Sequence, residues 1–278
     1  MQYALSTAPE AIAVRMLLDV GQLVKTGKLS VLVFFVICFA VISITLYAAK
    51  RGRKMKIRAI AGLEAVLEGI GRAVENRRPV AVDLHTGGLT SIDGVLALTY
   101  LSYVAEKSAQ LGADFLVGVG SADANPVAQD IVKTAYTSAG KEEQYDATKM
   151  IRFMSPAQWG YTGGWLGLVA REKPGMIFIA GAMGAEVMLV AEAGQWAGAM
   201  QIACSTSLLN IPFLIAGCDY VIIGEEHYAG AAIISNDPVQ LGCIVGQDYF
   251  KLITIGLIVI GSVLATLGST WLSSLLKV

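Results

Sequence analysis

Residues 29–49 read LSVLVFFVICFAVISITLYAA, a run of 21 residues that contains no Asp, Glu, Lys, Arg or His. At 1.5 Å of rise per residue, a helix over this run is about 30 Å long, which matches the hydrocarbon core of a bilayer. A second run, residues 252–276, has 25 residues without a charge and lies between Lys251 and Lys277. We therefore predict two transmembrane helices, with a buried soluble helix as the alternative for each.

The composition of the 278-residue chain agrees with this prediction. Hydrophobic residues make up 55% of the sequence and charged residues 15%, whereas soluble globular chains contain about 25% charged residues. This composition excludes a free soluble enzyme. The apolar content and the net charge of −1 also exclude a disordered chain.

Positive charge directly follows the first apolar run. Residues 50–58 hold six cations and no anion, whereas residues 1–28 hold three cations and two anions. The positive-inside rule then places residues 50–251 in the cytoplasm and both termini outside the cell, in a multi-pass protein of the cytoplasmic membrane. We expect the six cations to meet anionic lipid headgroups, with a nucleic-acid patch as the alternative. They are Lys50, Arg51, Arg53, Lys54, Lys56 and Arg58.

Two further helices are expected beside the first apolar run. Within the extracytoplasmic segment 1–28, residues 7–25 have an apolar and a polar face, which fits a helix on the outer membrane surface or against a neighbouring subunit. A cleavable signal peptide fits poorly, because its cations should precede the apolar stretch. Residues 56–76 carry apolar residues at helical spacing, so that residues 50–78 are predicted to form a basic stalk that continues the membrane helix.

Residues 79–251 alternate short apolar runs with longer helical patterns. The runs lack period-two alternation, as strands buried on both faces do. We predict a parallel, doubly wound, Rossmann-like α/β domain in the cytoplasm, inserted between the two transmembrane helices. The predicted strands are residues 80–84, 115–119, 176–180, 201–204 and 220–223. The predicted helices are residues 91–111, 126–138, 157–171, 185–199 and 207–217.

Charge and cysteine content narrow the range of partners. Residues 59–251 hold 11 Lys and Arg against 20 Asp and Glu, a net charge of −9, which disfavours nucleic acid. The four cysteines show no paired CxxC spacing and are expected to be free thiols. Lipid and further copies of the chain remain as expected partners, and a small-molecule ligand is possible.

The carboxyl ends of the predicted strands are rich in polar and small residues, and both histidines of the chain follow them. In open parallel sheets, ligands bind at this edge. Glycine turns, helix amino termini and carboxylates beside histidines would suit a phosphorylated metabolite or a nucleotide. The alternative is that these residues only form turns and helix caps. The candidate ligand-binding residues are Asp83, His85, Thr86, Gly87, Gly88, Ser121, Asp123, Gly184, Glu186, Ser205, Thr206, Glu225, Glu226 and His227.

Sequence signatures for particular cofactors are missing. The chain has no GxGxxG after a predicted strand, no GxxxxGK[ST], no HExxH and no GxSxG. We therefore predict no cofactor and no metal site. Asp83, His85, Asp123 and His227 could form a metal or acid–base set only if the strands that carry them end close together.

Small residues recur every four positions near the end of the second apolar run, which permits close helix packing in lipid. The predicted packing residues are Gly261, Ala265, Gly268 and Ser269. Neither run carries an ionisable group, which argues against a proton pathway. Residues 158–165 combine two Trp and one Tyr with three Gly, which fits a surface contact or ordinary core packing.

The layout resembles a family of uncharacterised two-span membrane proteins of bacteria and archaea. The resemblance rests on residues 50–54 (KRGRK) after the first crossing and on the turns at 82–88 (VDLHTGG) and 181–186 (GAMGAE), and it extends over nearly the whole chain. It implies no activity and therefore transfers no catalytic residue.

The sequence favours a non-enzymatic role. We expect a membrane scaffold whose cytoplasmic domain assembles with copies of itself into a ring. The alternative is a membrane-tethered enzyme or small-ligand sensor that uses the carboxyl edge of the sheet. A channel is the least favoured, because each subunit has only two uncharged crossings.

Overall fold

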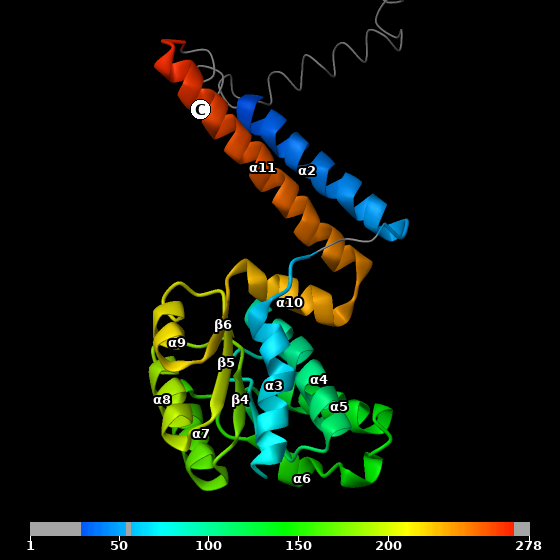
Figure 1. Cartoon of the computed structure of the whole chain (residues 1–278), viewed down its shortest axis with the longest axis vertical. Coiled ribbons are helices and arrows are strands. Elements are labelled where there is room, and N and C mark those ends of the chain that lie inside the picture. The colour runs from blue at the N-terminus through cyan, green and yellow to red at the C-terminus, as the bar shows by residue number, and fades with distance from the viewer. Residues whose placement is uncertain (1–28, 54–56, 270–278) are drawn as a thin grey trace, which may run out of the picture. The chain divides into compact units, whose positions relative to one another are not determined.

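Figure 1 shows the computed structural model of the chain, which describes residues 29–53 and 57–269. Contacts divide the chain into two compact units. The helical unit comprises the described parts of residues 1–56 and 238–278, and the α/β unit comprises residues 57–237. The helix expected over residues 7–25 lies outside the described residues.

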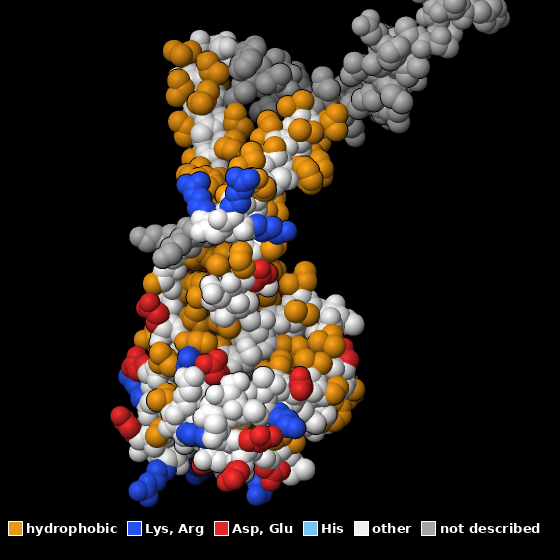
Figure 2. Space-filling model, turned by 90° about the vertical axis from the view of Figure 1, so that its right-hand side faces the viewer, with side chains coloured by type: hydrophobic (Ala, Val, Ile, Leu, Met, Phe, Trp, Pro, Cys, Tyr) orange, Lys and Arg blue, Asp and Glu red, His pale blue; other side chains and the backbone are white. Residues whose placement is uncertain are grey.

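The helical unit consists of α2 (Leu29–Lys50) and α11 (Pro238–Thr266), which pack against each other. Both helices are long and apolar enough to cross a membrane. Their large apolar side chains are largely exposed, as for Phe35 (69%) and Ile258 (62%). Figure 2 shows these side chains as columns of apolar surface with Lys and Arg gathered at one end.

Two glycines on α11 bring it close to α2. A Cβ added to Gly246 would lie 2.6 Å from Thr45 Oγ1, and one added to Gly242 would lie 2.9 Å from Ala49 Cβ. The Thr45 hydroxyl donates to the Val41 and Ile42 carbonyls of its own helix, so its hydrogen bonds are made within α2. Small residues four positions apart therefore make this contact, as in many membrane helix pairs.

Only two of the four predicted packing residues near the end of the second apolar run lie on a helix. The second apolar run was expected to be helical to residue 276, but α11 ends at Thr266. Gly268 takes a φ of 78°, and the Ser269 N–H bonds to the Leu264 carbonyl at 2.9 Å. This is a glycine-terminated helix end. Gly268 and Ser269 therefore follow the helix, whereas Gly261 and Ala265 lie on it.

The predicted stalk is not a continuation of α2. The helix ends at Lys50, where Gly52 takes a φ of 82° and the Arg53 N–H bonds to the Ala48 carbonyl at 3.2 Å. α3 (Ala61–Glu75) begins separately and packs its buried face against the sheet of the α/β unit. The helical periodicity was read correctly, but the glycine turn interrupts the helix.

The α/β unit is a six-stranded parallel sheet in the order β3-β2-β1-β4-β5-β6, with helices on both faces (Figure 1). This strand order is that of a Rossmann-like, doubly wound sheet. The strands are β1 (Val80–Asp83), β2 (Phe115–Val119), β3 (Ile151–Phe153), β4 (Met176–Ile179), β5 (Met200–Ser205) and β6 (Tyr220–Ile223).

Helices of the α/β unit form two layers. α3 with α4 (Ile92–Leu111), α5 (Ala124–Ser138) and α10 (Glu225–Ser235) covers one face of the sheet. The other face is covered by α7 (Gln158–Glu172), α8 (Val187–Ala197) and α9 (Ile211–Gly217). The short helices η1 (Glu142–Gln144) and α6 (Ala147–Met150) precede β3.

The structure confirms the α/β class, the parallel sheet and the five predicted strands. It adds β3, a three-residue edge strand in which only Ile151 is buried. β1 and β4 are central and buried at every position, which explains their unbroken apolar sequence. Tyr161 and Trp165 of α7 are fully buried in the core, so the aromatic segment serves packing at these two positions.

Candidate functional site

β1 and β4 are neighbours at the centre of the sheet, and the chain leaves them in opposite directions. After β1 it enters α4 on one face, and after β4 it enters α8 on the other. Their two loops therefore separate at the carboxyl edge, which is the topological switch point where doubly wound proteins bind ligands.

His85 lies at this point in an unusual backbone conformation. Its φ is 47°, in the left-handed region that non-glycine residues rarely adopt. The His85 N–H donates to Asp83 Oδ1 at 2.8 Å, and its carbonyl accepts from the Gly120 N–H at 2.8 Å. These bonds bring the buried imidazole back toward β1, with Nδ1 3.5 Å from Asp83 Oδ1. The left-handed conformation of a non-glycine residue costs about 1–3 kcal/mol of folding free energy, which the surrounding contacts must offset.

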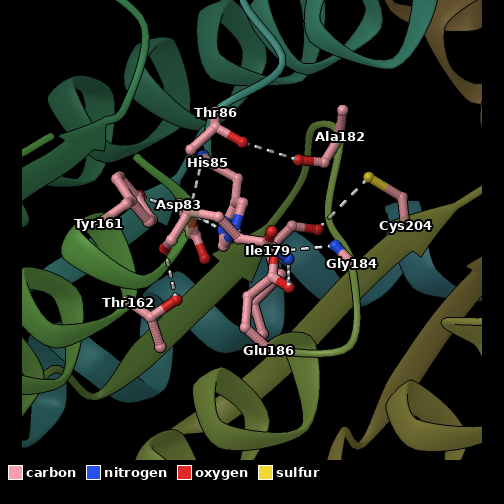
Figure 3. Close-up of polar contacts among 11 residues, drawn as sticks. Asp83, His85, Thr86, Tyr161, Thr162, Ile179, Ala182, Gly184, Glu186 and Cys204 are labelled. Atoms are coloured by element: carbon pink, nitrogen blue, oxygen red, sulfur yellow. Dashed lines mark hydrogen bonds and ion pairs between the residues drawn. The ribbon is translucent and has the colours of Figure 1, made fainter. Parts of the chain in front are cut away.

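Glu186 faces His85 from the loop that follows β4 (Figure 3). Its carboxylate is buried, and Oε1 lies 2.8 Å from His85 Nε2. The same oxygen accepts from the Gly184 N–H at 2.8 Å, and Oε2 accepts from the Gln158 side chain. One carboxylate thus joins β1, the β4–α8 loop and the first turn of α7.

The two carboxylates favour the charged form of His85. Burial lowers the pKa of His85, but Asp83 and Glu186 together raise it more, so that it lies above the usual value of 6.5. Burial also raises the pKa of Glu186, but the Gly184 and Gln158 hydrogen bonds outweigh this and leave it below 4.5. Charge and hydrogen bonding therefore shift His85 toward its protonated form and Glu186 toward its ionised form, which favours an ion pair in this buried site.

Tyr161 completes the network from α7. Its hydroxyl donates to Asp83 Oδ1 at 2.5 Å, and its ring meets the His85 ring edge-on at 4.6 Å. Burial raises the pKa of Tyr161 well above 10, so the phenol stays a donor. Asp83 Oδ2 and His85 Nδ1 have no hydrogen-bond partner within the described ranges.

This arrangement mainly fixes the two loops. His85 Nε2, the nitrogen that would exchange protons with a substrate, is engaged by Glu186. Asp83, His85 and Glu186 are each at most 1% exposed. What remains accessible is the loop surface at Thr86 and Gly87, with Thr86 Oγ1 3.4 Å from the Ala182 carbonyl.

A second polar group joins the loops after β1 and β2. Asp123 Oδ2 accepts from the Leu89 N–H at 3.0 Å, and Oδ1 accepts from the Ser121 hydroxyl and, at 2.9 Å, from the Ala124 N–H. Gly88 leaves no room for a side chain beside Ser121. Among the candidates, Gly88, Ser121 and Asp123 are thus brought together: Ser121 donates to Asp123, and Gly88 lies against both side chains.

A third group lies at the ends of β5 and β6. His227 is fully buried and stacks on Tyr100 at 5.2 Å, while its Nε2 is 3.9 Å from Asp93 Oδ1. Thr206 donates to that same oxygen at 2.9 Å, and Ser205 is buried at the end of β5. Burial lowers the pKa of His227 to about 4, against the opposing effect of Asp93, so the ring is neutral at pH 7.

The four residues that could have formed a metal or acid–base set do not come together in the structure. They are Asp83, His85, Asp123 and His227. His85 contacts Asp83, Asp123 bonds to the loop after β1, and His227 faces Asp93. Within the described ranges, no three His, Cys, Asp or Glu side chains are grouped as a metal site.

The remaining candidates lie elsewhere. Glu225 begins α10, and Glu226 forms an ion pair with Arg58. Lys50 ends α2, and the Arg51 guanidinium lies 4.5 Å from the centre of the Tyr47 ring. Arg53 lines a groove between α2 and α11. Lys54 and Lys56 lie outside the described residues.

Sequence reasoning missed the partners that complete these networks, namely Tyr161, Gln158, Asp93 and Tyr100. The helix between β3 and β4 starts at the carboxyl edge beside β1, so polar side chains in its first turn lie near Asp83. Residues 158–165 contain these polar side chains of α7, but only the strand order shows that they lie near Asp83.

The fold and this site define a class: α/β proteins with a doubly wound parallel sheet, a buried ion-pair network at the switch point and two apolar helices. A family profile described as a domain of unknown function (DUF6754) matches residues 20–276. The chain belongs to this uncharacterised family. No curated protein and no solved structure matches it.

Proposed function

We propose that the chain is an integral protein of a bacterial or archaeal cytoplasmic membrane. In this proposal, α2 and most of α11 cross the membrane. Their exposed apolar side chains support this, because water would not stabilise such surfaces. Lys50, Arg51 and Arg53 follow the first crossing and favour a cytoplasmic location for that end and for the chain up to α11. Both termini are then outside the cell.

The proposed role is a self-assembling scaffold in which the α/β units join head to tail into a closed ring. The observation that carries it is a pair of apolar surfaces on opposite faces of the sheet. A groove of about 570 Å³ between α7 and α8 is lined by Leu166, Leu189 and Trp196, the last 84% exposed. On the α4 side, Ile92 and Val95 are 67% and 48% exposed. Two different surfaces give the heterologous contact that a ring needs.

Complementation between variants tests this contact. We expect the wild-type chain to form assemblies of many copies in mild detergent, measured by light scattering during size exclusion. Trp196→Ser and Ile92→Ser each remove one surface, so each variant alone should be monomeric. A mixture of the two should form dimers, because each retains the surface that the other lacks. Trp159→Ser removes an exposed Trp outside the groove and should leave the assembly unchanged. A monomeric wild type, or variants that assemble normally, would contradict the proposal.

A second proposal is favoured by the strained His85 turn at the switch point, since such strain concentrates at functional sites. In it, the α/β unit is a membrane-tethered enzyme or sensor for a phosphorylated metabolite or nucleotide. The ligand would contact the loop at Thr86 and Gly87, while Asp83, His85 and Glu186 hold that loop in place.

Thermal denaturation with a panel of nucleotides and sugar phosphates tests this site. A bound ligand should raise the melting temperature of the full chain in detergent. Thr86→Val should abolish that shift and change the ligand-free melting temperature little, because Thr86 is half-buried and its hydrogen bond to the Ala182 carbonyl is long, at 3.4 Å. A panel without any shift would count against the site.

A further inference from the structure

We propose that the groove between α2 and α11 binds one anionic phospholipid. This inference rests on the proposed membrane location of the two helices. The groove has a volume of about 340 Å³, and apolar side chains form most of its wall, including Val41, Ile44, Ala48 and Ile253. Arg53 lines the same groove. An apolar groove with a cation beside it is complementary to a lipid, whose apolar acyl chain is joined to a negatively charged phosphate.

The turn after α2 places Arg53 at this groove. α2 ends at Lys50, and the left-handed Gly52 reverses the chain so that the Arg53 N–H bonds back to the Ala48 carbonyl at 3.2 Å. Ala48 is itself part of the groove wall. The backbone of Arg53 is therefore held beside the groove wall by this hydrogen bond, and its side chain lines the groove.

The charge of Arg53 is available to a ligand. Its guanidinium has no carboxylate partner in the parts of the chain that the structure describes. Asp248 of α11 is already paired with Lys251 at 3.1 Å. Arg51, two residues earlier, differs because its guanidinium lies over the Tyr47 ring at 4.5 Å. Arg53 is thus the described cation that combines a free charge with the apolar groove.

The chemistry of the groove favours a phospholipid with a net negative charge. A guanidinium binds phosphate oxygens through two parallel hydrogen bonds. Tyr249 also lines the groove and is 49% exposed, in keeping with a phenol that reaches the headgroup level. A zwitterionic lipid carries an ammonium group that competes for the same phosphate, so it should bind more weakly. Free phosphate would leave the apolar wall unused.

Native mass spectrometry of the full chain released from detergent tests the site. Phosphatidylglycerol or phosphatidylcholine with identical acyl chains is added, and bound lipid is counted. We expect one phosphatidylglycerol per subunit and at least tenfold less phosphatidylcholine. Arg53→Gln should remove this preference, whereas the matched variant Arg51→Gln should keep it. Ala48→Phe fills the groove and should lower the binding of both lipids.

Several results would overturn the lipid site. Equal binding of the two lipids by the wild type would do so, as would equal losses in Arg53→Gln and Arg51→Gln, which indicate diffuse attraction to the basic segment. Displacement of the lipid by millimolar inorganic phosphate would show a simple anion site. Alkaline washing of membranes separates the two proposals. A chain that stays in the membrane but shows no lipid preference overturns only the lipid site, whereas a chain released by the wash overturns the membrane location as well.

Discussion

At the scale of single residues, His85 is stabilised in a left-handed conformation by carboxylates on both sides. Asp83 binds its backbone N–H at 2.8 Å, and Glu186 binds its ring at 2.8 Å. A buried charge of this kind depends on its partners, because removing one leaves the other uncompensated. The ion pair therefore links the conformation of two loops to the protonation of one imidazole.

Glu186→Gln tests this link. The amide keeps the shape of the side chain but removes the charge that faces His85, so we expect the free energy of unfolding to fall by about 3 kcal/mol. It would be measured by denaturant unfolding of the full chain in detergent. Glu192→Gln, at an exposed position of α8, should change it by less than about 0.5 kcal/mol. Equal stability of the two variants would show that the ion pair contributes nothing.

The pKa of His227 is shifted in the opposite direction to that of His85, so we expect it to make the stability depend on pH. Its pKa in the folded chain is about 4, below the usual 6.5. The unfolded chain therefore binds the proton more readily, so the stability from neutral His227 is present above pH 6.5 and is lost as the pH falls toward 4. Between pH 7 and pH 5 this group should cost about 2 kcal/mol.

His227→Phe removes this titration and keeps a ring to stack on Tyr100. Unfolding of wild type and variant between pH 7 and pH 5 should show a loss about 2 kcal/mol smaller in the variant. Parallel pH profiles for the two proteins would mean that His227 can be protonated in the folded state at little cost.

At the scale of elements, the contact between α2 and α11 depends on backbone approach. A side chain at Gly246 would collide with Thr45, whereas nothing lies within 4 Å of a Cβ added to Gly256 on the same helix. Gly246→Val should therefore destabilise the pair by about 1–3 kcal/mol, and Gly256→Val should not. Thermal unfolding of the full chain in detergent measures the difference. A Gly256 variant as unstable as the Gly246 variant would indicate that helix propensity, not packing, is responsible.

The regular elements were predictable because their apolar runs are long and buried on both faces. β1 and β4 are examples, since every position in them is buried. β3 was missed because a three-residue edge strand buries only Ile151 and carries almost no periodic signal. The break at Gly52 was missed because the helical periodicity resumes on its far side, in α3.

The candidate site was predictable in position but not in connectivity. Strand ends meet at one edge in any parallel sheet, so the strand pattern alone predicts that Asp83, His85 and Glu186 lie at this edge. Which carboxylate pairs with which histidine depends on strand order and loop direction. The sequence could not show that His227 would face Asp93 of α4 instead of joining His85.

At the scale of the whole molecule, the two units differ in the side chains that they expose. The α/β unit has a core and an internally paired polar edge, whereas the helical unit leaves its apolar side chains exposed. Membership of an uncharacterised family adds no activity. The proposed membrane location is therefore the claim on which the ring, the tethered ligand site and the lipid groove all depend.

Labelling of a single cysteine tests that claim most directly. A cysteine is placed at the exposed residue Asp130 of α5 in a chain without its four natural cysteines, and a membrane-impermeant maleimide is added to cells and to inverted membrane vesicles after alkaline washing. We expect the washed vesicles to retain the chain and to be labelled, and intact cells to remain unlabelled. Labelling of intact cells, or release of the chain by the wash, would contradict the account.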